Sequence, residues 1–144
     1  MEILNYFLIS LVVFAGLIGG WLVGIIAKEE LKPGKKYLVL LEKFLFSAVF
    51  LIAIIFVVNN IWLSIIFVGA LVYLLGTDGP VKDILVYVLF GVAFYLSVER
   101  LFLLQAALMF VYGFPAGSLE KGVKEIIVKY AWFIPIAVLL FLVI

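Results

Sequence analysis

The sequence predicts an all-α integral membrane protein, a polytopic bundle of about five transmembrane helices. Hydrophobic residues make up 69% of the 144 residues and charged residues only 13%. Soluble domains average about half apolar and about a quarter charged residues. A soluble fold of this size could not bury so much apolar side chain, because its surface-to-volume ratio is too high. The apolar residues also form runs that are long enough to cross a bilayer and too continuous for barrel strands.

The composition excludes several kinds of chemistry. The chain contains no His and no Cys, which excludes disulfides, zinc sites built from these residues, His- or Cys-ligated haem and a Ser-His-Asp triad. The net charge of +1 is too small to indicate a nucleic-acid partner. We therefore expect no catalytic residue, no metal site and no cofactor in this chain.

The first apolar run covers residues 3–27, and Asn5 and Ser10 are its only polar interruptions. It exceeds the apolar part of a signal peptide and no basic residue precedes it, so we expect a membrane span rather than a cleaved leader. A charged segment follows over residues 28–37 and contains Pro33-Gly34, a strong turn signal. The sequence therefore predicts a polar loop between the first two spans.

The second and third runs cover residues 39–58 and 61–76, and Asn59-Asn60 marks a tight turn between them. The last run covers residues 126–144 and contains Pro135, which should kink the helix because it removes a backbone hydrogen bond.

The fourth run, residues 84–112, is unusually long for one span. As a single helix it would measure about 43 Å, so it must tilt steeply, extend beyond the membrane or break. A six-pass variant would fold it into two short arms at Glu99-Arg100. Residues 98–101 contain no turn-forming residue, however. The sequence therefore favours one long helix and five spans, and the six-pass variant stays open.

Five spans would place the two ends of the chain on opposite sides of the membrane. Lysines would then divide six to three between the sides, and the excess places the loop over residues 28–37 in the cytoplasm, with the N-terminus outside and the C-terminus inside. The six-pass variant would divide the Lys and Arg residues nine to one. Nothing in the sequence divides residues 1–144 into more than one domain.

Three glycines, Gly16, Gly20 and Gly24, recur every four residues in the first run and form one smooth helix face. Such small-residue faces let two helix backbones approach closely in a membrane. The pattern predicts close helix packing. Its partner is either another helix of this chain or a second subunit.

Glu99, Arg100 and Gln105 are the polar residues of the fourth run that could form a binding site. A charge at mid-membrane costs about 2.5–3.5 kcal/mol, so such residues usually face a polar interior or the headgroup boundary. The group either lies at that boundary or binds an ion, a lipid headgroup or a small solute. Asp78 and Asp83 fit turn and capping positions better than a metal site.

The sequence favours a non-catalytic subunit or scaffold of a membrane complex. One alternative is an oligomeric small-solute or ion transporter or channel that uses the polar group around Glu99-Arg100. A second alternative is a membrane-embedded lipid-modifying enzyme, which would depend on Asp78, Asp83 or Glu99. The expected partners are the lipid bilayer and either further copies of the chain or other membrane subunits.

Overall fold

A computed structural model describes residues 2–57, 60–77, 80–98, 101–120 and 122–143 of the chain. These residues form six helices, and the all-α prediction is therefore confirmed. The helices are α1 (Ile3–Ile26), α2 (Lys28–Val57), α3 (Ile61–Gly76), α4 (Pro80–Leu96), α5 (Phe102–Ser118) and α6 (Val123–Val143).

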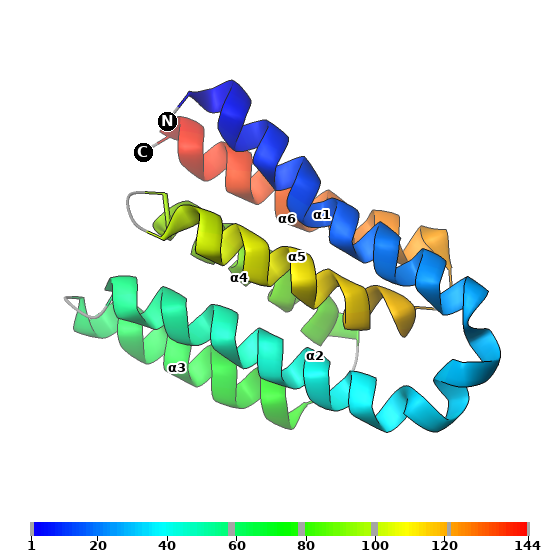
Figure 1. Ribbon diagram of the computed structural model, residues 1–144. Coiled ribbons are helices and arrows are strands. Elements are labelled where there is room, and N and C mark those ends of the chain that lie inside the picture. The colour runs from blue at the N-terminus through cyan, green and yellow to red at the C-terminus, as the bar shows by residue number, and fades with distance from the viewer. Residues whose placement is uncertain (1, 58–59, 78–79, 99–100, 121, 144) are drawn as a thin grey trace.

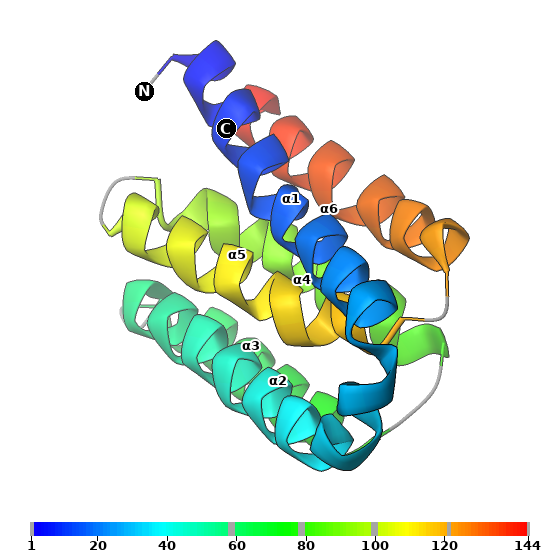
Figure 2. The same cartoon turned by 45° about the vertical axis from the view of Figure 1, so that its right-hand side comes forward.

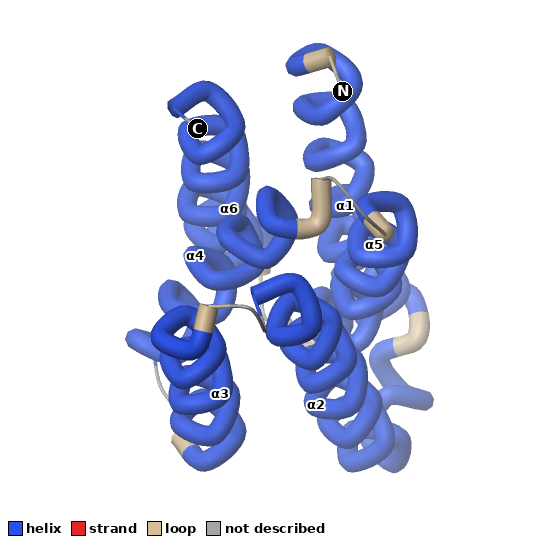
Figure 3. The backbone as a smooth tube through the Cα atoms, turned by 90° about the vertical axis from the view of Figure 1, so that its left-hand side faces the viewer, coloured by secondary structure: helices blue, strands red, loops and turns tan. Residues whose placement is uncertain are grey.

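The six helices form a bundle of three stacked pairs. Successive helices run in opposite directions, so the N- and C-terminal ends lie side by side at one end of the bundle (Figure 1). Viewed nearly end-on, α4 and α5 form the middle pair, with α1 and α6 on one side and α2 and α3 on the other (Figure 3). Five antiparallel helices would place the two chain ends at opposite ends of the bundle, and the structure differs because its described residues form an even number of helices.

Three of these helices are long and apolar enough to cross a membrane: Ile3–Ile26, Lys28–Ile55 and Val123–Val143. Two shorter helices, Ile61–Gly76 and Phe102–Ser118, are also apolar. Large apolar side chains point outward along all of these helices, an arrangement that water would penalise and lipid tails would not. These features indicate a multi-pass membrane protein.

The predicted single helix over residues 84–112 is wrong, because α4 ends at Leu96 and α5 begins at Phe102. The hydroxyl of Ser97 donates to the carbonyl of Phe94 at 2.8 Å, and the Val98 amide donates to the carbonyl of Tyr95 at 3.1 Å, as the last turn of α4 tightens. Leu101 then adopts the left-handed conformation, with φ of 54°. Packing of α4 against α6, and of α5 against α1 and α2, thus compensates for the turn residues that the sequence lacks.

The predicted loop over residues 28–37 is also wrong, because α2 already begins at Lys28. Only Ala27 separates α1 from α2. The first turns of α2 are not collinear with the rest of the helix, and the chain reverses its direction there (Figure 1). Lys and Glu are good helix formers, and Glu29 and Glu30 stabilise the first turn through the helix dipole. These contributions outweigh the one hydrogen bond that Pro33 removes.

The glycine face of α1 packs against α5 within the chain, where the two helices lie side by side (Figure 1 and Figure 2). A Cβ atom on Gly16 or Gly20 would collide with the backbone of α5 at Phe110 or Phe114, and one on Gly24 would lie 3.0 Å from the Ser118 carbonyl oxygen. Gly113 and Gly117 provide the matching small face on α5. This face is therefore occupied inside the monomer and cannot also hold a second subunit.

Aromatic side chains fill much of the core and join its layers. Tyr6 of α1 stacks on Phe141 of α6 with ring centroids 4.5 Å apart, and its hydroxyl donates to the Ala137 carbonyl at 3.1 Å. Phe94 of α4 lies 5.0 Å from the Tyr6 ring. A second aromatic group, formed by Phe46, Phe50, Phe90 and Tyr112, joins α2, α4 and α5. The core is thus dense and largely apolar.

Candidate functional site

Of the three predicted binding residues, the structure describes only Gln105. Glu99 and Arg100 lie outside the described residues. The Gln105 side chain is fully buried, and its Nε2 donates to the Val49 carbonyl at 3.2 Å. Its Oε1 accepts no hydrogen bond within the described part of the chain. Gln105 therefore joins α5 to the backbone of α2, and a ligand-binding role for the predicted group stays a prediction.

The interior offers little to a polar solute. In the part of the chain that the structure describes, the buried polar residues are Ser10, Ser97 and Gln105. The hydroxyls of both serines donate to carbonyls three residues earlier in their own helices. The two serine hydroxyls thus form hydrogen bonds within their own helices and do not line a continuous polar path through the bundle.

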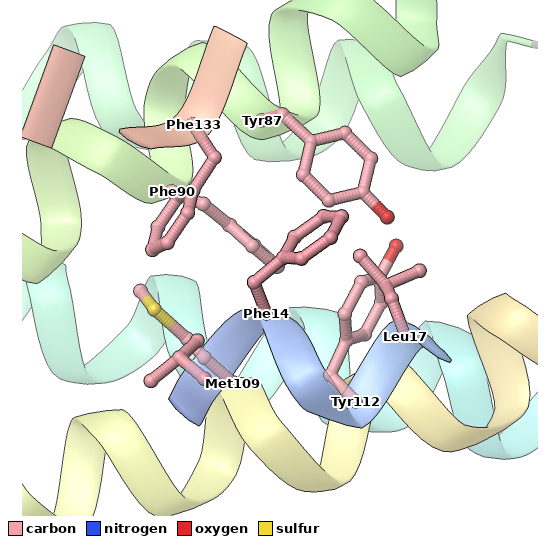
Figure 4. Close-up of a pocket in the computed structure, with 8 residues that line it drawn as sticks. Phe14, Leu17, Tyr87, Phe90, Met109, Tyr112 and Phe133 are labelled. Carbon is pink, nitrogen blue, oxygen red and sulfur yellow. The ribbon is translucent and has the colours of Figure 1, made fainter. Parts of the chain in front are cut away.

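The main polar cluster instead lies in the half of the bundle where α1 ends and α2 begins. Glu42 of α2 accepts a hydrogen bond from the hydroxyl of Tyr112 of α5, at 3.3 Å. Tyr87 of α4 points its hydroxyl toward that of Tyr112 (Figure 4). Three helices thus bring together a carboxylate and two phenols at the edge of an apolar core.

Behind these phenols the core leaves a cavity of only about 10 Å³. Its lining residues are shown in Figure 4, and they are apolar or aromatic apart from the two tyrosine hydroxyls. A volume of this size admits at most one water molecule. The cavity is therefore a packing defect and too small for a substrate.

Two larger cavities open in the same half of the molecule, one on each side of α4. The first measures about 250 Å³, and Val39, Glu42, Lys43, Phe46, Leu74, Leu75, Lys82, Val86 and Tyr112 line it. The second measures about 450 Å³, and Asp83, Ile84, Glu120, Lys124, Glu125, Val128 and Trp132 line it. Each combines charged side chains with an apolar wall, as expected of a site for an amphiphilic molecule.

Among the described residues, no three acidic side chains are placed to hold a metal ion together. Asp83 lies in the first turn of α4, where its negative charge interacts favourably with the helix dipole. Asp78 lies outside the described residues. The described side chains around Glu42 offer charge recognition and hydrogen bonding.

Sequence reasoning missed the contact between Glu42 and Tyr112. Glu42 and Lys43 fit the pattern of charged residues that reach the headgroups from a helix end, and Tyr112 fits an aromatic residue at the end of a span. The contact joins residues 70 positions apart, and no local pattern indicates such a pairing. The sequence signal for it is limited to a carboxylate and a tyrosine that each lie near the end of an apolar run.

Comparisons of this chain with known protein families, with curated proteins and with solved structures found no match.

Proposed function

We propose that this protein is a non-catalytic, six-pass subunit or scaffold of a membrane complex. The observation that carries the proposal is the apolar, aromatic interior, in which the Ser10 and Ser97 hydroxyls and the Gln105 amide nitrogen donate to backbone carbonyls. A transporter or channel needs polar groups that line a water-filled path. The described residues supply none inside the bundle, so a structural role is favoured over conduction through one copy.

Six spans require that the three shorter helices also cross the membrane. The shortest helices, α3, α4 and α5, contain 16 or 17 residues and measure about 24–26 Å. Spans as short as about 17 residues cross a bilayer, and local thinning accommodates a small mismatch.

Charge supports an orientation for these six spans. All nine lysines belong to α2, α4, α6 or the connection before α6, whereas Arg100 belongs to the connection between α4 and α5. The nine-to-one bias favours a cytoplasmic location for the lysine-bearing end of the bundle. Both termini would then lie on the outer side, which revises the expected cytoplasmic C-terminus and keeps residues 28–37 in the cytoplasm.

The proposal is tested by purifying the tagged full chain from its native membrane and reconstituting it alone in proteoliposomes. A structural subunit is expected to copurify with the same membrane protein at a constant molar ratio in two different mild detergents. The isolated chain is expected to give no ion or solute flux above that of empty liposomes. A matched purification of an unrelated tagged membrane protein identifies background partners.

Saturable flux through the isolated chain would instead establish the transporter alternative. A chain that purifies alone under every mild condition, including after cross-linking in intact cells, would contradict the subunit proposal.

A further inference from the structure

The cavity of about 250 Å³ lies between α2, α3 and α4, with Tyr112 of α5 behind it. It is smaller than the roughly 300–1,000 Å³ of pockets that enclose whole drug-sized ligands. A polar headgroup with the first part of an attached chain suits this volume better than a complete large ligand. Its position beside the lysines of α2 and α4 places it where the membrane interface would lie.

One side of this cavity is charged and partly fixed in position. Lys43 and Lys82 contribute two ammonium groups, and Glu42 contributes one carboxylate. The carboxylate accepts the hydrogen bond of Tyr112, whose side chain is only 5% exposed. Because Tyr112 is held by packing, the carboxylate is oriented before any ligand arrives, which lowers the entropy cost of binding.

The other side of the cavity is apolar. Val39 and Phe46 of α2, Leu74 and Leu75 of α3, and Val86 of α4 form this wall. A free phosphate ion would leave this wall in contact with water, whereas an attached acyl chain would cover it. The combination of two cations and an apolar wall therefore matches a phosphate group that carries a hydrocarbon chain.

We propose that this cavity binds the headgroup of a membrane phospholipid, with its phosphate between Lys43 and Lys82 and its acyl chains along the apolar wall. Glu42 then faces the headgroup substituent beyond the phosphate, where a hydroxyl or an ammonium group can donate to the carboxylate. The site goes beyond the proposed structural role and requires only that the bundle lies in a membrane.

The second large cavity provides an internal contrast. It is lined by Asp83, Glu120 and Glu125 but by only one lysine, Lys124. This excess of carboxylates disfavours a phosphate there. A phospholipid is therefore expected to occupy the cavity between α2, α3 and α4 and to leave the cavity between α4 and α6 empty.

The proposal is tested by native mass spectrometry of the detergent-solubilised full chain titrated with phosphatidylglycerol, with diacylglycerol or with inorganic phosphate. Phosphatidylglycerol is expected to bind at one site. Diacylglycerol, which keeps the chains but lacks the phosphate, is expected to bind at least about tenfold more weakly. Inorganic phosphate at millimolar concentration is expected not to displace the lipid, because it cannot cover the apolar wall.

Two double variants distinguish the effect of the cavity lysines from the effect of the general positive charge at the same end of the bundle. K43Q/K82Q removes both cavity lysines and is expected to weaken phosphatidylglycerol binding by at least about tenfold. The control K32Q/K35Q makes the same change in charge at two exposed lysines outside the cavity. It is expected to change the affinity by no more than about twofold, because neither of these lysines lines the cavity.

Equal losses in the two double variants, equal binding of diacylglycerol, displacement by inorganic phosphate, or the absence of any bound lipid would each overturn the proposal. Circular dichroism and gel filtration establish that the variants are folded. If K43Q/K82Q does not fold, the comparison of phosphatidylglycerol with diacylglycerol on the unmodified protein decides the question.

Discussion

Leu101 has a backbone conformation that leucine rarely adopts. Its φ of 54° and ψ of 20° place it in the left-handed region, where a Cβ atom crowds the following carbonyl at a cost of about 1–2 kcal/mol. The side chain is 56% exposed, so little packing depends on it. The reversal between α4 and α5 therefore contains local strain that the rest of the fold overcomes.

Leu101→Gly is expected to stabilise the protein by about 0.5–1 kcal/mol, because glycine adopts this conformation without the steric cost. The greater conformational freedom of glycine in the unfolded chain offsets part of this gain. Thermal unfolding in detergent measures the change. Leu101→Ala is the matched control, since it removes the same side chain but keeps the Cβ atom. A glycine variant no more stable than the alanine variant would show that the turn is unstrained.

Gln105 contributes one buried hydrogen bond and one buried oxygen that accepts none within the described part of the chain. Gln105→Leu removes both groups and fills a similar volume, so we expect the stability to change by less than about 1 kcal/mol. Gln105→Glu keeps the shape but buries a carboxyl group beside the Val49 carbonyl. It should destabilise the bundle by about 2 kcal/mol or more. Chemical unfolding of both variants in the same detergent distinguishes these effects.

At the scale of elements, the contact between α1 and α5 depends on the absence of side chains. Gly16 and Gly20 meet backbone atoms of α5, and Gly113 meets the backbone of α1 at Gly16 and Leu17. Ser118 of α5 adds a hydrogen bond from its hydroxyl to the Gly20 carbonyl at 2.9 Å. Close backbone contact of this kind supplies dispersion energy that hydrophobic burial cannot supply in lipid.

Gly20→Leu is expected to separate α1 from α5 and to destabilise the protein by about 3 kcal/mol or more, because backbone atoms cannot move aside as a flexible side chain can. Thermal stability in detergent and monodispersity on gel filtration report the loss. Gly69→Leu is the control, since a Cβ atom on that residue of α3 meets nothing within 4 Å. Equal stability of the two variants would contradict the described helix contact.

At the scale of the whole molecule, the even number of helices and the distribution of lysine act together. The two termini lie at one end of the bundle (Figure 1), and the lysines belong to the helices and connections of the other end. An odd number of spans would have divided the lysines between the two sides. The break between α4 and α5 therefore makes the number of described helices even and brings the two termini to the same end of the bundle.

Because the chain has no Cys, single-cysteine variants can report this topology without background. In intact cells, a membrane-impermeant maleimide is expected to label Glu2→Cys and Val143→Cys but to leave Lys35→Cys unlabelled until the membrane is opened. The reason is the excess of lysine at the end that contains residue 35. Labelling of only one of the two terminal positions would restore the five-span topology.

The sequence by itself determined the membrane class, the bounds of α1 and α3 to within one residue, and the glycine face of α1. These features are local, because hydropathy and the spacing of small residues are properties of one segment. Only the tertiary structure decided that Lys28 begins a helix and that residues 84–112 fold back on themselves. It also decided that α5 covers the glycine face and that Glu42 meets Tyr112. The helix that begins at Lys28 reflects local helix propensity, which outweighs the hydrogen bond that Pro33 removes. The other outcomes depend on contacts between segments far apart in the chain, and such contacts outweigh the weak local preferences of a stretch without turn-forming residues.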